Sequence, residues 1–410
     1  MKKKLLVLFG VSLILGSCSK NINQTPGPSG LSKSSSSSQS LSALASTAAI
    51  NAASTQQTVQ GFGGASILAW EADLTSTQRT EAFSTSSGIG MSILRVMVPS
   101  TGTGSFAAEK PTIDAAKSYG AKVVSTAWNA PPSMMTGVHL NTADYAAYAA
   151  YLSSYNTAVG GVYAISAFNE PNYSGSGWME ATATEVANFV AAEGSNCGAP
   201  IMAPEPFNMD QTFINTYLSN ATAKSKTSFV CGHIYGTTPY NLGSIGKDVW
   251  MTEHYTSSTV SGNDWPNAMT AAKEINDCMN AGWAGYVYWY IRRSYGPIDE
   301  SSNITKLGYV MAQFARYVRP GYIKISCTEN PASGVYVTAY KNGSQLVIVI
   351  VNQNAATTYQ SFSLSGISVS NFNRYYTNST SNLATNSFTV SGSSFGINLT
   401  GSSVTTLVSY

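Results

Sequence analysis

The sequence predicts an α/β protein built from a (β/α)8 TIM barrel and a C-terminal side β-sandwich domain. Between residues 59 and 318, eight apolar strand-like runs alternate with helix-like stretches, which is the pattern of a parallel α/β barrel. Over residues 319–410, short segments alternate apolar and polar residues between Gly, Asn and Ser turns, as strands of an antiparallel sandwich do. A doubly wound open sheet is the alternative for the first region, but it needs a phosphate-binding first turn that the sequence lacks.

The chain begins with a segment that resembles a bacterial lipoprotein signal. Three lysines follow Met1, residues 5–15 are apolar, and small residues precede Cys18. We therefore expect residues 1–17 to be removed and Cys18 to carry a lipid, with a plain secretory signal as the alternative. Residues 18–45, which include a run of serines, predict a flexible tether. These features predict an exported protein, either anchored in the outer membrane at the cell surface or secreted.

Composition excludes several classes of partner and site. Charged residues make up 10% of the 410 residues and the net charge is +2, so no basic field exists to attract nucleic acid. The three histidines lie too far apart for a local metal motif, and no cofactor is implied. Four cysteines follow the signal: Cys197, Cys231, Cys278 and Cys327. They permit three disulfide pairings, and the sequence does not decide between these pairings and four free thiols. We expect a monomer whose membrane contact is the lipid alone.

The elements follow in order along the chain. Residues 46–58 alternate weakly and predict an edge strand that joins the side domain. The barrel strands are expected at residues 59–66, 92–98, 122–127, 164–169, 200–203, 229–235, 248–252 and 285–289, with three glycines crowding the end of the first. Helices are expected at residues 75–86, 107–119, 142–155, 182–193, 210–218, 266–281 and 304–317, whereas residues 236–247 are too short for one. Strands of the side domain are expected at residues 334–340, 345–351, 360–364, 372–376, 387–390, 394–399 and 403–409.

Two of the barrel strands deliver a glutamate to their carboxyl ends. Glu170 follows the fourth strand and Glu253 the seventh. Catalytic groups of such barrels come from these strand ends, and two facing carboxylates are the minimum equipment for splitting a glycosidic bond. We predict a carboxyl separation of about 5 to 5.5 Å, the geometry of a retaining enzyme, with Glu253 as the ionised nucleophile. Glu170 is the expected acid/base, with a pKa raised by its charged neighbour.

Other polar and aromatic residues are expected around this pair. Asn169 would hold a sugar hydroxyl, although Asn-Glu-Pro is alternatively a helix-capping turn. Tyr235 is the expected hydrogen-bond donor to Glu253, and His233 is more simply a satisfied core residue. Trp128 ends the third strand as a candidate sugar platform, or else caps the core. Arg95 is expected to order the carboxylates rather than touch substrate.

Several motifs together resemble glycoside hydrolase family 30, subfamily 8, the bacterial glucuronoxylanases. They occupy residues 60–64 (Gln-Gly-Phe-Gly-Gly), 92–95 (Ser-Ile-Leu-Arg), 128–129 (Trp-Asn), 163–166 (Tyr-Ala-Ile-Ser), 169–171 (Asn-Glu-Pro), 250–253 (Trp-Met-Thr-Glu), 288–296 and 314–321. The resemblance covers residues 50–410. It implies an endo-β-1,4-xylanase that requires glucuronic acid branches, with Glu170 as acid/base and Glu253 as nucleophile.

The resemblance also implies a set of branch-binding residues: Tyr255, Ser258, Trp289, Arg293 and Tyr295. A guanidinium pairs with a carboxylate in two parallel hydrogen bonds, so Arg293 suits the glucuronate. For the adjacent Arg292 we expect an ion pair in the barrel wall.

Two loops depart from the family pattern and leave the outer subsites open. Residues 99–105 are small and Gly-rich, and residues 172–178 keep a single tryptophan. Two other functions also remain open. One is another retaining glycanase, such as a β-glucosidase-like enzyme or a β-1,6-glucanase. The other is a non-catalytic surface glycan-binding lipoprotein.

Overall fold

The structure, a computed structural model, describes residues 46–410. The expected signal segment, the tether and the lipidation site Cys18 lie outside the described residues. Eight parallel strands close into a barrel in the order β10-β11-β2-β3-β4-β7-β8-β9. Their bounds are β2 Gly61–Ala65, β3 Ile93–Val98, β4 Lys122–Ala127, β7 Ala164–Ser166, β8 Ile201–Pro204, β9 Thr227–His233, β10 Asp248–His254 and β11 Gly285–Tyr288. All eight expected strands are confirmed.

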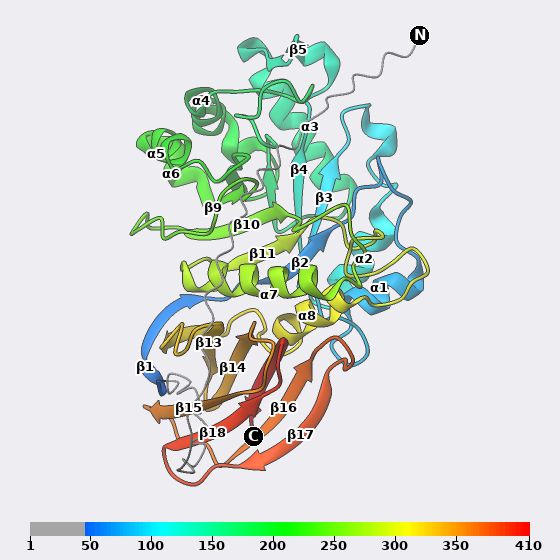
Figure 1. Ribbon diagram of the computed structural model, residues 1–410. Helices are drawn as coiled ribbons and strands as arrows, with labels where there is room; N and C mark the ends of the chain where they lie inside the picture. The colour runs from blue at the N-terminus through cyan, green and yellow to red at the C-terminus, as the bar shows by residue number, and fades with distance from the viewer. Residues whose placement is uncertain (1–45) are drawn as a thin grey trace, which may run out of the picture. The chain divides into compact units, whose positions relative to one another are not determined.

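Helices connect the strands, as expected (Figure 1). They are α1 Ser76–Phe83, α2 Lys110–Ser118, α3 Tyr145–Ala158, α4 Ala183–Glu193, α5 Gln211–Ser219, α6 Ala221–Lys226, α7 Trp265–Asn280 and α8 Lys306–Ala315. Helix α6 was not expected. It is capped by the preceding residue, Asn220, whose side chain accepts hydrogen bonds from two backbone amides of the first turn. Residues 234–247 form no helix, in agreement with the prediction. A short hairpin, β5 Met135–Thr136 and β6 His139–Leu140, lies in the loop after β4.

The barrel is filled by apolar side chains from the inner faces of its strands. One buried cluster joins Ile93, Val124, Ala164, Met202, Phe229, Cys231, Trp250, Ala284 and Val287. The glycines of β2 permit close approach to β3, because a Cβ atom on Gly63 would lie 1.9 Å from the carbonyl oxygen of Ile93. The packed interior leaves the carboxyl ends of the strands as the place for a site.

The remaining strands form a nine-stranded sheet in the order β17-β16-β19-β14-β13-β12-β1-β15-β18. Their bounds are β1 Ala48–Thr58, β12 Ile323–Cys327, β13 Val335–Asn342, β14 Gln345–Asn352, β15 Thr358–Ser365, β16 Asn371–Thr377, β17 Ala384–Thr389, β18 Ser394–Leu399 and β19 Ser403–Ser409. Strand β12 was not expected. The N-terminal strand joins this sheet as predicted, but it is not an edge strand: β1 pairs antiparallel with β12 and parallel with β15.

The sheet folds over on itself to make a sandwich. Phe372 of β16 and Phe395 of β18 come from opposite ends of the strand order, yet their ring centroids are 5.2 Å apart. Side chains from one face of eight of the strands form a single buried cluster between these ends. The predicted side β-sandwich is therefore confirmed, with one internal parallel pair.

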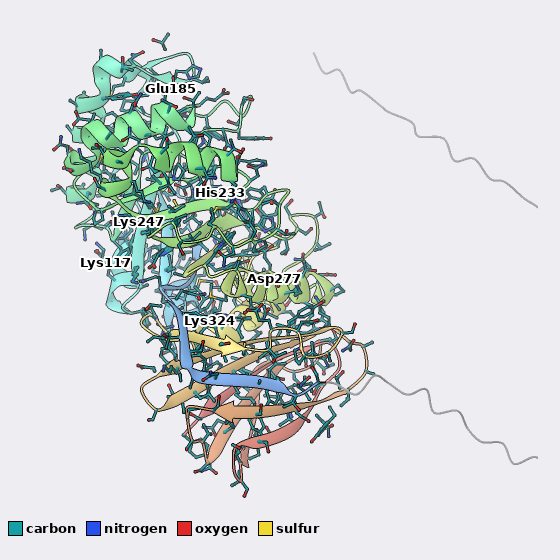
Figure 2. All side chains as sticks on the ribbon, turned by 90° about the vertical axis from the view of Figure 1, so that its left-hand side faces the viewer. Lys117, Glu185, His233, Lys247, Asp277 and Lys324 are labelled. Atoms are coloured by element: carbon teal, nitrogen blue, oxygen red, sulfur yellow. The ribbon has the colours of Figure 1, made fainter. Side chains whose placement is uncertain are left out.

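Helices α7 and α8 lie between the barrel strands and the sheet (Figure 1). Val347, Val349 and Val351 of β14 belong to the same buried cluster as residues of these two helices. Trp265 of α7 donates a hydrogen bond of 2.8 Å to Ser402, and Gln313 of α8 donates one of 2.9 Å to Thr377. In Figure 2, Asp277 marks helix α7 and Lys324 marks strand β12.

The four cysteines within residues 46–410 are free thiols, and three of them are buried. The sequence left open three disulfide pairings or four free thiols, and the structure shows four free thiols. In the described part of the chain, no helix is both long and apolar enough to cross a membrane.

Candidate active site

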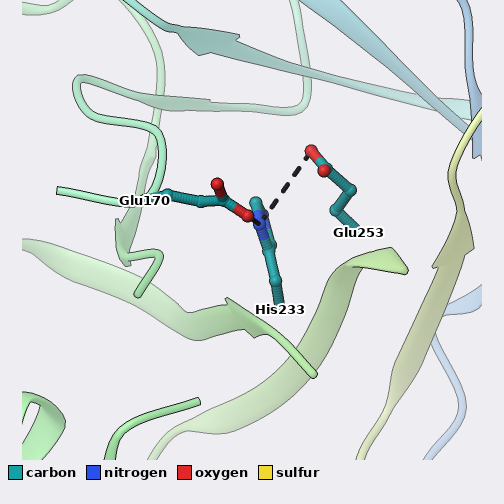
Figure 3. A group of neighbouring side chains, drawn as sticks. All are labelled: Glu170, His233 and Glu253. Atoms are coloured by element: carbon teal, nitrogen blue, oxygen red, sulfur yellow. Dashed lines mark hydrogen bonds and ion pairs between the residues drawn. The ribbon is translucent and has the colours of Figure 1, made fainter. Parts of the chain in front are cut away.

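The two predicted glutamates meet at the carboxyl end of the barrel (Figure 3). Glu253 is the sixth residue of β10, and Glu170 follows β7 by four residues. Glu170 adopts a left-handed backbone conformation with φ of 47°, and its amide donates a 3.0 Å hydrogen bond to the carbonyl oxygen of Glu205. This tight turn, rather than the strand itself, aims the Glu170 carboxylate at Glu253.

An oxygen of Glu170 and an oxygen of Glu253 lie within 4.8 Å of each other. Retaining glycosidases hold their carboxyl groups about 5 to 5.5 Å apart, whereas inverting enzymes leave about 6.5 to 9.5 Å for a water molecule. The observed separation fits the retaining class, as the sequence predicts.

Two donors hold Glu253. Arg95 Nη1 donates to Glu253 Oε2 at 2.7 Å, and the Tyr235 hydroxyl donates to Glu253 Oε1 at 2.9 Å. Arg95 is fully buried and also donates to the Asn169 side-chain oxygen at 2.7 Å. Donors on both oxygens fix the orientation of the carboxylate. The expected contact from Tyr235 and the expected ordering role of Arg95 both match these contacts.

His233 lies beneath the pair and bridges two carboxylates. Its Nδ1 lies 2.7 Å from Glu170 Oε1 and its Nε2 lies 3.3 Å from Glu205 Oε1. Toward ionised carboxylates, both ring nitrogens act as donors, which requires the protonated imidazole. Burial opposes this charge, but the neighbouring carboxylates outweigh it, and the pKa of His233 rises to about 9.

His233 is thus more than the core residue that the sequence suggested. Glu170, His233 and Glu253 are close enough together to hold a metal ion. A cation there would need the lone pair of a neutral ring nitrogen, so a cation and the His233 proton compete for this position.

Glu205 is the site residue that sequence reasoning missed. It is fully buried and forms an ion pair of 2.9 Å with Arg95. Although burial opposes ionisation, the charges of Arg95 and His233 hold the pKa of Glu205 below its usual range. A signal was present, because a Glu-Pro pair, Glu205-Pro206, follows β8, as Glu170-Pro171 follows β7.

The pKa of Glu170 is raised, as expected, but the main cause differs from the prediction. Burial contributes most, and repulsion from Glu253 is a smaller effect that the proximity of His233 counteracts. The raised pKa favours the protonated form that a general acid needs.

A cavity of about 600 Å³ opens above the carboxylates. Its lining includes seven of the eight predicted substrate-binding residues: Trp128, Asn169, Tyr235, Tyr255, Trp289, Arg293 and Tyr295. Ser258, the eighth, lies further along the loop after β10 than Tyr255; it is exposed and does not line the cavity. Sequence reasoning missed Tyr290, which follows Trp289 in the loop after β11, and three residues on other loops at the same barrel end: Trp70, Tyr173 and Phe207. A larger groove of about 750 Å³ near helix α1 is lined by a single carboxylate, Glu81.

One wall of the cavity is a group of four tryptophans. Trp70 packs against Trp128, Trp178 and Trp289 with ring centroids 5.4, 5.6 and 5.9 Å away. Trp128 is 3% exposed and lies over the Arg95 guanidinium at 4.6 Å. Both alternatives predicted for Trp128 therefore apply in part: it is buried in this group, as a residue that caps the core would be, and it lines the cavity, as a sugar platform would.

The two adjacent arginines after β11 share one partner. Arg292 Nη2 lies 2.6 Å from Glu71 Oε2, which gives the wall ion pair expected for Arg292. Arg293 lines the cavity but also forms an ion pair with Glu71, through Nη1 and Oε1. The sequence did not predict the second pair.

Comparisons with known proteins agree with this site. No protein-family model matches the sequence. Glucuronoxylanase XynC of Bacillus subtilis strain 168 is 38% identical over 385 residues, covering 88% of this chain and 90% of the relative. A GH30 endoxylanase structure from Clostridium papyrosolvens C71 is 31% identical, with a TM-score of 0.82, covering 89% of this chain and all of that chain.

A second structure is the glycoside hydrolase family 30 subfamily 8 xylanase Xyn30A from Clostridium acetobutylicum. It is 31% identical, with a TM-score of 0.81 over 88% of this chain and 99% of that chain. The endo-β1,6-glucanase BT3312, at 18% identity and a TM-score of 0.72, shares the fold alone. The identities to XynC and to the two clostridial xylanases extend over most of each chain. The protein therefore belongs to glycoside hydrolase family 30, subfamily 8, and is a glycoside hydrolase.

Proposed function

We propose that the protein is a retaining endo-β-1,4-xylanase that cleaves glucuronoxylan at a position set by a glucuronic acid branch. The observation that carries this proposal is the Glu170–Glu253 pair at the base of a cavity that also holds Arg293. The relatives named glucuronoxylanase support the same substrate.

In the first step, an oxygen of Glu253 forms a bond to the anomeric carbon of a xylose unit. The bond from that carbon to the leaving xylose oxygen breaks, and Glu170 transfers its proton to this oxygen. Burial of Glu170 favours the protonated starting state. Arg95 and Tyr235 orient Glu253 for attack.

In the second step, water replaces the departed chain. Glu170, now ionised, takes a proton from the water while the water oxygen bonds to the anomeric carbon. The bond between that carbon and the Glu253 oxygen breaks. Two inversions give net retention. His233 remains a donor to Glu170 and stabilises its ionised form between the steps.

The branch would lie against Arg293 and the aromatic residues around it. Tyr255 and Tyr295 lie with ring centroids 5.8 Å apart on this side of the cavity. Trp289, in the cavity wall, offers a ring face. Arg293 supplies the positive charge for the glucuronate carboxylate.

Product mapping tests the proposal. We expect digestion of glucuronoxylan to yield products with the glucuronate at a fixed distance from the new reducing end, initially in the β-anomeric form by NMR. Arabinose-branched and unbranched xylan should release far less sugar. Equal release from all three would contradict branch recognition. Activity on β-1,6-glucan instead would assign the enzyme to the other glycanase class.

Two variants test the residues. Glu253→Gln should abolish release, and a wild type that releases nothing would instead favour a glycan-binding protein. Arg293→Ala should lower kcat/KM on glucuronoxylan about 10- to 100-fold, because a charge-assisted hydrogen bond contributes about 1.5 to 3 kcal/mol.

We also propose that the enzyme acts as a monomer at the cell surface, held by a lipid on Cys18. The basic and apolar start of the sequence supports export. Palmitate labelling of the wild type but not of Cys18→Ala would test the anchor.

A further inference from the structure

Glu71 bridges the two arginines that follow β11. It lies in the loop after β2, where its amide donates a 3.1 Å hydrogen bond to the carbonyl oxygen of Ile67, and Trp70 beside it lines the cavity. Its two carboxylate oxygens face different arginines, Oε2 toward Arg292 and Oε1 toward Arg293. The Glu71 side chain is 18% exposed, so this ion pair is partly shielded from water.

The remaining groups of Arg293 are also constrained. Its Nη2 points to the carbonyl oxygen of Trp70 at 3.5 Å, its guanidinium lies 4.4 Å from the ring centroid of Tyr290, and its buried Nε has no partner within the described residues. Both terminal nitrogens therefore already face acceptors from the loop after β2. A carboxylate can form two parallel bonds with the two terminal nitrogens or with Nε and one terminal nitrogen. Because Nε of Arg293 is buried, a branch carboxylate would approach the terminal nitrogens that already face these acceptors.

Arg292 makes an exchange of partners feasible. Its Nη2 also donates to the carbonyl oxygen of Ala72 at 3.0 Å, so this second arginine is anchored independently of Arg293. If Arg293 turns to a substrate carboxylate, Glu71 keeps a counter-charge 2.6 Å away in Arg292. Glu71 is thus not left as an unpaired, partly buried charge.

We propose that Glu71 is a specificity-determining residue, an internal carboxylate that competes with the glucuronate branch for Arg293 and so limits how strongly the enzyme depends on that branch. This inference rests on the proposed function. It requires that the charge of Glu71, and not its shape, opposes binding of an acidic branch. Binding of unbranched, neutral xylan does not use Arg293, so the charge of Glu71 should not change it.

The experiment compares Glu71→Gln with the wild type on two defined substrates: a xylo-oligosaccharide with one glucuronate branch and its unbranched counterpart. Glutamine keeps the size of the side chain and an acceptor for Arg292 but removes the charge. We expect KM for the branched substrate to fall about 3- to 10-fold with kcat within twofold, and both constants for the unbranched substrate to stay within twofold. Inhibition by methyl β-glucuronide should strengthen by a similar factor, while methyl β-glucoside serves as the neutral control.

Glu300→Gln provides the matched control, since it removes one exposed carboxylate from the same loop as Arg293. A higher KM for the branched substrate in Glu71→Gln would overturn the inference, because Glu71 would then hold Arg293 in place for binding. An unchanged KM in Glu71→Gln, with a raised KM in Arg293→Ala, would also overturn it while leaving branch recognition intact. If Arg293→Ala treats both substrates like the wild type, branch recognition by Arg293 fails, and the role of Glu71 fails with it.

Discussion

At the residue scale, the site concentrates unusual backbone and charge states at the strand ends. Glu170, Glu205 and Tyr290 all have positive φ, at 47°, 59° and 55°, and all three lie at or next to the cavity. A non-glycine residue in such a conformation costs on the order of 1 to 3 kcal/mol. The hydrogen bonds and ion pairs around Arg95 and His233 offset part of this cost and orient the carboxylates.

The doubly donating His233 predicts a specific pH dependence of stability. Its pKa is raised from an ordinary value of 6.5 to about 9, so its contribution is fully present below pH 6.5 and is lost as pH rises through about 9. At about 1.4 kcal/mol per unit, this amounts to on the order of 3 kcal/mol. We expect the free energy of unfolding, measured in urea at pH 6.5, 8 and 9.5, to fall more steeply in the wild type than in His233→Gln.

The control for this measurement is His139→Gln, which alters an exposed histidine. Its curve should run parallel to that of the wild type. Parallel curves for His233→Gln and the wild type would show that His233 is neutral in the folded protein, and the double-donor assignment would be wrong.

At the element scale, the position of β1 in the sheet is the feature with the largest consequence. Strand β1 fills the gap between β12 and β15, so the start of the described chain completes a sheet made mostly of its last 90 or so residues. Alternate residues of β1, among them Ile50, point into the sandwich core.

Truncation of Ile50 tests whether β1 is integral to the sheet. Ile50 is 1% exposed, so Ile50→Ala should lower the free energy of unfolding by about 2 to 5 kcal/mol through lost burial and a cavity. Thr55→Ala is the control, because Thr55 lies in the same strand, pairs with β12 and is exposed. It should change stability by less than about 0.5 kcal/mol. If Ile50→Ala changes the free energy of unfolding in urea as little as Thr55→Ala does, β1 is not an integral part of the sheet.

At the scale of the whole molecule, the barrel and the sandwich share a buried core through α7 and α8. Thr406 of β19 donates a 2.7 Å hydrogen bond to the carbonyl oxygen of Gln313 in α8, in addition to the contacts of Trp265 and Gln313. Extensive shared burial of this kind favours unfolding as one cooperative unit.

The tryptophans allow a direct test, because all seven lie between Trp70 and Trp289, in the barrel. Ile350→Ala, in the core of the sandwich away from α7 and α8, should therefore shift the unfolding midpoint seen by tryptophan fluorescence. We expect this shift to equal the one seen by far-ultraviolet circular dichroism, after a loss of about 2 to 4 kcal/mol. A fluorescence midpoint that stays at its wild-type value while the circular dichroism curve splits in two would show that the domains unfold independently.

The sequence by itself determined the architecture and the identity of the carboxylate pair. The alternation of apolar strands and helices predicted every barrel strand, and the position of Glu170 and Glu253 at strand ends predicted their meeting. These features are local, since they depend on periodicity and on what ends each strand. The same local reasoning predicted Tyr235 as a site residue, whereas Trp289 and Arg293 were expected from the family resemblance; all three line the cavity.

The tertiary structure decided what depends on partners distant in sequence. The internal place of β1, the ion pair of Glu205 with Arg95, the double donation by His233 and the pairing of Glu71 with Arg293 all join segments 28 to 300 or so residues apart. No local pattern specifies which buried carboxylate meets which arginine, because that choice depends on how the barrel closes. The sequence therefore predicted which groups do the chemistry, whereas the closed barrel determined their charge states and which carboxylate already holds the arginine expected to bind the branch.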